Sequence, residues 1–241
     1  MNTISKDLEK IIRNGLDIAS VLGIEQLLID SESMRGENKE TSTNIIFDMS
    51  DVDMPVDAIG LGRTPTLKSR MALFEDPVLE YTTKTADGSE FIDNLIIKSG
   101  RSKTGFRCHS PSRTAKAPKR IRDPIGVSLS MKDDDITRLT KGITSMIAET
   151  IVVSIVDGRT SIIVNDKVGD EFVHELEGHV KVQDNEFPSN FSATYKSKTF
   201  RAIVTNYLKK DDNEVLPISI TSRGIMIVTV LGINIYLFPE R

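Results

Sequence analysis

The sequence contains NGLDIASVLGIEQLLID at 14–30 and, 127 residues later, the similar stretch KGITSMIAETIVVSIVD at 141–157. Each stretch begins as the end of an amphipathic helix and continues into an apolar run that is typical of a strand. Gly15 matches Gly142, and Asp30 matches Asp157 where the apolar run stops. Two copies of one helix-to-strand unit predict two similar domains rather than a solenoid, which needs more repeats.

Four amphipathic segments are predicted to be helices, at about 5–19, 64–75, 130–146 and 198–208. Strand-like runs fill much of the remainder, at 24–29, 44–49, 78–84, 91–99, 104–109, 151–156, 160–164, 171–182, 215–221, 225–230 and 233–238. The polar stretch 31–43 is predicted to be a turn or loop. This pattern predicts an α+β fold in which each domain packs two helices on an antiparallel sheet.

The two predicted domains are separated by SPSRTAKAPKRIRDPIG, at 110–126. This stretch contains three prolines, little apolar content and five basic residues against one aspartate, which is typical of a connector. We therefore expect a first domain at 1–110, a connector at 111–126 and a second domain at 127–241.

Composition limits the possible functions and locations. A formal net charge of −4 argues against a protein that coats nucleic acid over its whole surface. The single cysteine, Cys108, rules out an internal disulfide, and MNTISKDLEK lacks the apolar segment of a secretory signal. The longest mainly apolar run, 224–238, is short for a membrane span and is interrupted by Gly232 and Asn234. These features predict a cytoplasmic protein.

The sequence contains no convincing catalytic motif. The histidines of HELEGH, at 174–179, are five residues apart, whereas a zinc protease needs them four apart on a helix. Gly60 and Gly62 lack the lysine and hydroxyl of a phosphate-binding loop, and Cys108 beside His109 does not make a nucleophile and base. Asp133–Asp135 are explained by the start of a helix, where acidic residues are favoured. We predict no enzyme activity, no metal and no cofactor.

Basic residues gather on the outer faces of three of the four predicted helices. Asp17 and Asp134 lie near two of these faces. The grouping of one sign of charge in an acidic protein indicates a surface that binds a phosphate backbone. No base-reading motif is present, so this binding should have no sequence preference. The residues are Lys6, Lys10 and Arg13, then Arg138 and Lys141, then Lys198, Arg201 and Lys209.

Two stretches near the end of the sequence are distinctive, FSATYKSKTFRAIVTNYL at 191–208 and LPISITSRGIMIVTVLGINIYLFPER at 216–241. They are the most specific part of a resemblance, over nearly the whole chain, to DNA sliding clamps of the phage and proliferating cell nuclear antigen type. The second stretch is similar to the closing strands and terminal Tyr-Leu-x-Pro of those clamps. NDKVGD at 165–170 also resembles phage clamps.

This resemblance implies a homotrimeric ring around double-stranded DNA, with DNA polymerase and a clamp loader as partners. A phage origin would place it in the cytoplasm of a bacterial host. The expected DNA-facing residues are Lys6, Lys10, Arg13, Lys68, Arg138, Lys141, Lys198, Arg201 and Lys209. The expected partner-binding pocket contains Ile121, Tyr236, Leu237, Phe238 and Pro239. The expected subunit interface contains Thr104, Phe106 and Cys108 from one domain, and Phe172, His174 and Leu176 from the other.

Three alternatives stay open at the level of sequence. A monomeric processivity factor of the same fold would hold DNA by charge alone and show a steep salt dependence. An enzyme of nucleic-acid metabolism would use His109, His174 or Asp133–Asp135. A structural subunit of a virion would leave the basic helix faces unexplained.

Overall fold

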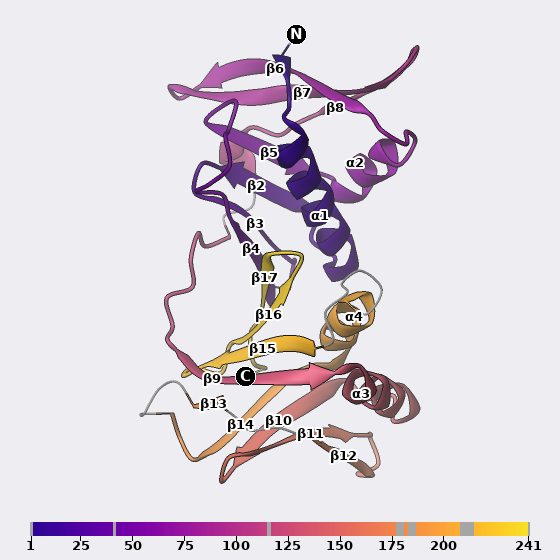
Figure 1. Ribbon diagram of the computed structural model, residues 1–241, viewed down its shortest axis with the longest axis vertical. Helices are drawn as coiled ribbons and strands as arrows, with labels where there is room; N and C mark the ends of the chain where they lie inside the picture. Colours follow the sequence, from indigo (N-terminus) through magenta and orange to yellow (C-terminus); the bar gives the residue numbers. More distant parts are fainter. Residues whose placement is uncertain are drawn as a thin grey trace. The chain divides into compact units, whose positions relative to one another are not determined.

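The computed structural model describes residues 2–40, 42–114, 117–176, 181–182, 187–207 and 215–240. The chain forms two compact units, Met1–Arg120 and Ile121–Arg241. Within the described residues, each unit holds two α-helices among many strands (Figure 1), which confirms the predicted α+β class. No helix of the described part is both long and apolar enough to cross a membrane.

The first unit is built on one sheet with strands in the order β1-β6-β7-β5-β2-β3-β4, and β8 pairs with β7. The pairing is antiparallel except between β5 and β7, where Ala58 lies opposite Phe91 in a parallel contact. The strands are β1 (Asn2–Thr3), β2 (Gln26–Asp30), β3 (Ser33–Glu37), β4 (Thr43–Asp48), β5 (Ala58–Gly62), β6 (Val78–Ala86), β7 (Ser89–Ser99) and β8 (Ser102–Arg107).

Two helices, α1 (Lys6–Leu22) and α2 (Thr64–Met71), pack against each other in this unit, and a 3₁₀ turn, η1 (Pro111–Arg113), follows β8. Ser5 caps α1 as predicted, because its Oγ accepts a hydrogen bond from Leu8 N at 3.3 Å. Gly23 ends α1 in the left-handed conformation, with φ of 69°. The apolar positions of α1 point inward and most of its polar positions face solvent, whereas Glu9 is buried.

The second unit has two antiparallel sheets, in the orders β17-β16-β15-β9-β13 and β12-β11-β10-β14. Its helices are α3 (Asp133–Ser145) and α4 (Ser197–Tyr207). The strands are β9 (Ile125–Lys132), β10 (Thr150–Val156), β11 (Arg159–Asn165), β12 (Glu171–Glu175), β13 (Lys181–Val182), β14 (Asn190–Lys196), β15 (Val215–Thr221), β16 (Met226–Val230) and β17 (Ile233–Leu237).

The sequence repeat corresponds to a repeat of structure, because α1-β2-β3-β4 and α3-β10-β11-β12 follow the same order. The matched aspartates end equivalent strands. Asp157 and Gly158 form the tight turn between β10 and β11, with φ of 49° and 78°. Asp30 Oδ1 instead accepts hydrogen bonds from the N–H groups of Glu32 and Ser33, both at 3.0 Å, and so shapes the turn between β2 and β3.

Two predictions about strands were wrong, and two strands, β5 and β9, were not predicted, so that the helix expected from about 130 begins only after β9, at Asp133. The stretch 31–43 is not a loop throughout, because it contains β3, in which the polar residues Ser33 and Arg35 are buried as well as Met34 and Gly36. Arg35, at the centre of β3, is buried because its guanidinium lies 2.8 Å from Asp30 Oδ2. The single strand expected at 171–182 is two strands, since β12 pairs with β11 and β13 pairs with β9.

A buried tyrosine ties β14 to the turn between β15 and β16. Tyr195 Oη donates to the carbonyl oxygen of Gly224 at 2.7 Å, and burial raises the pKa of this phenol. We expect Tyr195→Phe to lower the free energy of unfolding by about 1–3 kcal/mol, because the buried carbonyl loses its donor. Urea unfolding measures the change, and a loss below about 0.5 kcal/mol would contradict it.

Candidate nucleic-acid interface

The outer face of α1 carries three of the basic residues expected to face DNA, and carboxylates already bind two of them. Lys6 Nζ lies 2.7 Å from Asp76 Oδ1 and 3.3 Å from Glu9 Oε2, and these hydrogen bonds raise the pKa of Lys6. Arg13 Nη2 lies 2.9 Å from Glu9 Oε1. Lys10 is exposed and pairs with no carboxylate among the described residues. Most of the positive charge of α1 is therefore neutralised locally.

The basic side chains beside α2 also have partners. Lys68 Nζ lies 3.0 Å from Asp17 Oδ1 of α1, so one helix supplies the carboxylate for the other. Arg63 and Arg70 lie over the ring of Phe106, with guanidinium carbons 5.1 and 5.9 Å from its centroid, where the ring face attracts a cation. Sequence reasoning missed these two arginines, because no local pattern links them to β8.

The second unit differs, because basic residues of α3 and α4 pair with no carboxylate within the residues that the structure describes. The two helices lie side by side (Figure 1). Arg138, Lys141 and Lys198 are exposed, and none pairs with a carboxylate in the part of the chain that the structure describes. Arg201 of α4 donates to Thr144 Oγ1 of α3 at 3.2 Å, a neutral partner that leaves its charge uncompensated.

Apolar packing fixes the direction of these cations. Ile136, Leu139 and Ile143 bury one face of α3, and Phe200 and Val204 bury one face of α4. The basic residues occupy the opposite faces. Lys209, also expected to face DNA, lies outside the described residues. Within the described residues, the unneutralised charge of the helices is thus concentrated on α3 and α4, where a phosphate could bind without displacing a described carboxylate.

The five residues expected to bind partner tails lie in the second unit, at its beginning and at its end. Those within β17 are buried, and the others are half-buried. Beyond β17, Glu240 N donates to Thr194 O at 2.8 Å and fastens the end of the chain to β14. Their role in binding a partner stays a prediction. The buried residues are Tyr236 and Leu237, and the half-buried ones are Ile121, Phe238 and Pro239.

The residues expected at the subunit interface on β8 and just after it point into their own unit. Phe106 and Cys108 are buried, and Thr104 is half-buried. Burial raises the pKa of the Cys108 thiol to about 12, so this cysteine is unreactive at neutral pH.

The matching residues of the other predicted edge also pack inward, against α3. A Cβ at Gly142 would lie 2.5 Å from the Phe172 ring, so only glycine fits beneath it. His174 Nε2 lies 2.9 Å from Asp135 Oδ1, and Leu176 is buried. This pairing gives His174 a structural role. Because successive side chains of a strand point to opposite faces, the residues next to these along β12 point outward. The same alternation could have identified the outward residues from the sequence.

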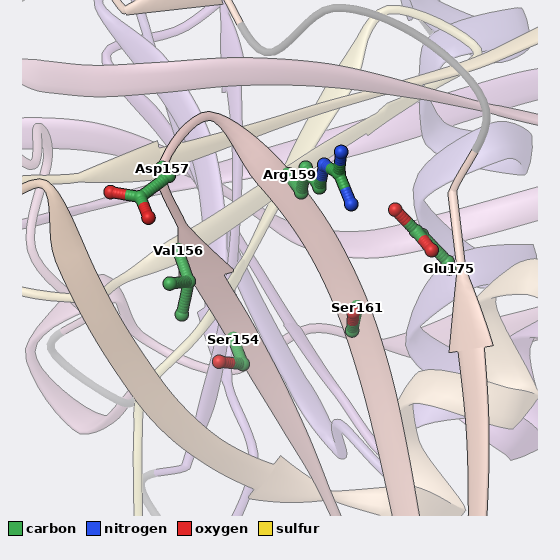
Figure 2. A pocket seen from close by; sticks show the side chains of 6 residues that line it. All are labelled: Ser154, Val156, Asp157, Arg159, Ser161 and Glu175. Atoms are coloured by element: carbon green, nitrogen blue, oxygen red, sulfur yellow. The ribbon is translucent and has the colours of Figure 1, made fainter.

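The solvent-facing side of β10, β11 and β12 has a hollow of about 530 Å³ (Figure 2). Ser154 and Ser161 lie opposite each other across β10 and β11, and their small side chains leave the space between the larger ones. The hollow is lined by two carboxylates, Asp157 and Glu175, and by no histidine or cysteine among the described residues. Among the described residues, no group of three or more His, Cys, Asp or Glu side chains could hold a metal ion. The lining residues are Ser154, Val156, Asp157, Arg159, Ser161 and Glu175.

The fold is that of PCNA-type sliding clamps. PCNA of A. fulgidus, in a structure with the C-terminal region of FEN-1 bound, matches with a TM-score of 0.65 and 12% identity over 96% of each chain. The proliferating cellular nuclear antigen of Entamoeba histolytica matches with a TM-score of 0.63 and 11% identity, over 95% of this chain and 96% of that one. No family model and no curated protein sequence matches this chain. The predicted clamp fold is therefore confirmed. Matches at such low sequence identity show a shared fold and nothing further.

Proposed function

We propose that this protein is a sliding clamp that encircles double-stranded DNA as a homotrimer and tethers a DNA polymerase for processive synthesis. The observation that carries the proposal is the clamp fold, which extends over 95–96% of the chain. A match to one unit alone would be compatible with many functions. A match that extends over both units supports the proposed clamp ring.

The charge on the helices supports the DNA-binding part of the proposal. The exposed cations of α3 and α4 are suited to phosphate contacts, which carry no sequence information. Loose and water-mediated contacts suffice, because a closed ring stays on DNA by topology and can slide. The protein then acts as a tether and not as an enzyme.

The partner-binding part of the proposal concerns the region around β17. The A. fulgidus structure holds the C-terminal region of FEN-1 on a clamp. We infer that tails of a polymerase and a clamp loader dock beside Tyr236, Leu237, Phe238, Pro239 and Ile121. Half-buried apolar residues next to an ordered strand suit an apolar anchor of a tail.

The mass of the protein in solution tests the ring. Light scattering coupled to size exclusion, over a concentration series at moderate salt, should give three times the subunit mass of 26.8 kDa. Closed circular duplex DNA then tests encirclement, because protein loaded on it should dissociate when a nuclease makes the circle linear. A linear duplex of equal length, blocked at both ends by bound protein, is the control and should retain it.

A persistent monomer at high concentration would contradict the ring and favour a clamp-fold factor that holds DNA by charge. Equal retention on circular, linear and end-blocked DNA would contradict encirclement while leaving the trimer intact.

A further inference from the structure

The end of α3 contains an isoleucine whose backbone takes a conformation that usually belongs to glycine. Ile147 has φ of 50°, in the left-handed region where a β-branched residue is a rare outlier. Two hydrogen bonds hold it there, from Ile147 N to Thr144 O at 3.4 Å and from Ala148 N to Ile143 O at 3.3 Å. This is the Schellman arrangement, in which the left-handed residue is usually glycine.

The side chain of Ile147 contributes little to the fold. It is 80% exposed, whereas backbone hydrogen bonds already secure the end of the helix. The first unit shows that such a helix end needs no isoleucine, because α1 ends with Gly23, which has φ of 69°. Glycine at position 147 would avoid both the steric cost of the left-handed backbone and the exposure of an apolar side chain. Strain of this kind clusters at functional sites.

The helix α4 contacts the chain on both sides of Ile147. Ser197, the first residue of α4, donates from its backbone N to Glu149 O at 3.0 Å, two residues after Ile147. Arg201 Nη1 donates to Thr144 Oγ1 at 3.2 Å, three residues before Ile147. The exposed isoleucine therefore lies where the end of α3 joins α4, beside the cationic face that the two helices share.

The charge around Ile147 is suited to a polyanion. Lys198 directly follows the first residue of α4 and is exposed, and Lys141 is exposed near the end of α3; neither pairs with a carboxylate within the described residues. The carboxylate of Glu149 is compensated, because Lys167 Nζ lies 2.7 Å from Glu149 Oε1, and this hydrogen bond lowers the pKa of Glu149. Phosphates are therefore the groups that the charge of this surface favours.

We propose that Ile147 makes an apolar contact with the deoxyribose groups of a duplex whose phosphates the neighbouring cations bind. The proposal rests on the DNA binding proposed above and adds to it a residue that contacts no phosphate. The sugars are the apolar part of the backbone and lie between successive phosphates, within reach of a side chain that stands among phosphate-binding cations. Contacts to sugars carry no sequence information. They also leave the bases stacked, unlike an apolar wedge that kinks the duplex.

Isoleucine suits a contact that forms and breaks repeatedly as DNA moves. Its branched β-carbon restricts χ1, so each contact costs little side-chain entropy. Its side chain has no group that could hydrogen-bond to a base. The hydrogen bonds of the helix end and the junction with α4 fix its backbone. Ile147 is thus held in one direction at the edge of the cationic face.

Replacing Ile147 by glycine tests the contact, because it removes the side chain and relieves the backbone together. We expect I147G to raise the melting temperature by about 2–4 °C and to weaken the binding of duplex DNA about three- to tenfold. The slope of log affinity against log salt concentration should stay unchanged, because no phosphate contact is lost. Fluorescence anisotropy with a duplex over a salt series measures the binding, and thermal unfolding measures the stability.

Leu231 provides a matched control, because it is an apolar residue with φ of 52° in the turn between β16 and β17 of the same unit. L231G removes an apolar side chain from the same backbone conformation and should leave the binding of duplex DNA unchanged. I147V keeps a β-branched apolar side chain at the contact and should bind like the wild type.

Equal binding of duplex DNA by I147G and the wild type would overturn the contact while the clamp proposal stands. A wild-type protein that binds no duplex at low salt would overturn the proposed DNA binding and the contact together. An equal loss of affinity in L231G would overturn the contact, because the loss would then follow from the change in backbone. A shallower salt slope in I147G would also overturn it, because the lost contact would then involve phosphate.

Discussion

Changing Lys198 and Arg201 together to glutamate is expected to reduce the affinity for duplex DNA at low salt by at least tenfold. Both side chains lie on the outer face of α4 and lack a carboxylate partner within the described residues. Each phosphate contact contributes about −0.9 to the slope of log affinity against log salt concentration. Loss of two contacts should therefore make this slope less steep by about 2. Fluorescence anisotropy with a duplex, repeated over a salt series, measures both quantities.

The matched control is R159E/K167E, which changes net charge equally. Arg159 lies in β11 and Lys167 just after it, and both are exposed residues of the same unit that belong to neither helix. Lys167 is paired with Glu149 in an exposed ion pair of little energetic weight. An equal loss of affinity in the control would show a general effect of charge and refute the assignment of α4. Both variants should unfold at the wild-type temperature.

Changing Asp30 to alanine is expected to have the largest effect on stability, a loss of about 3–5 kcal/mol, because it leaves a buried charge without its partner. Arg35 Nη1 lies 2.8 Å from Asp30 Oδ2, and the Arg35 side chain is only 7% exposed. The same carboxylate holds the turn between β2 and β3. Urea unfolding at pH 7 measures the loss. Asp30→Asn is the control, since it keeps the acceptor and removes the charge, and it should lose less.

The dependence on pH separates the charge of Asp30 from its hydrogen bonds. Burial would raise the pKa of Asp30, but hydrogen bonds from Arg35, Ser33 and Glu32 outweigh burial and hold it below 3.8. Because the pKa of Asp30 is lower in the folded protein, the ionised carboxylate stabilises the fold at pH values above its unfolded-state pKa of about 3.9. This stabilisation is lost as the pH falls through the folded-state pKa. Below pH 4, the wild type should therefore approach Asp30→Asn in stability. A constant difference down to pH 2 would contradict this.

Much of the fold follows from local sequence patterns, and the exceptions have physical causes. Ser5 and the periodic apolar residues after it predict α1, because capping and amphipathicity are local. β3 escaped detection because two of its buried residues, Ser33 and Arg35, are polar and hydrogen-bonded within the protein, Arg35 to Asp30. The repeat itself contained the missing signal: subtracting 127 from the strand predicted at 160–164 gives 33–37, which are the bounds of β3.

The candidate site, like the fold, could be predicted from the sequence only in part. Helical periodicity correctly places Lys6, Lys68 and Lys198 on polar faces, because this depends on neighbours within a few turns. The partners of these residues depend on tertiary structure. Asp76 follows Lys6 by 70 residues, and no periodic pattern connects them. The Glu9 to Arg13 pair is an exception, since its spacing of four on a helix could have been read directly.

The unequal neutralisation of the helices has a consequence for motion on DNA. In the proposed ring, each of the three subunits would contribute one strongly cationic helix pair, α3 and α4, and one largely neutralised pair, α1 and α2. The positive potential would then repeat three times in the ring, once per subunit. A duplex inside the ring would favour contact with one cationic pair at a time and would pass from pair to pair as its backbone rotates.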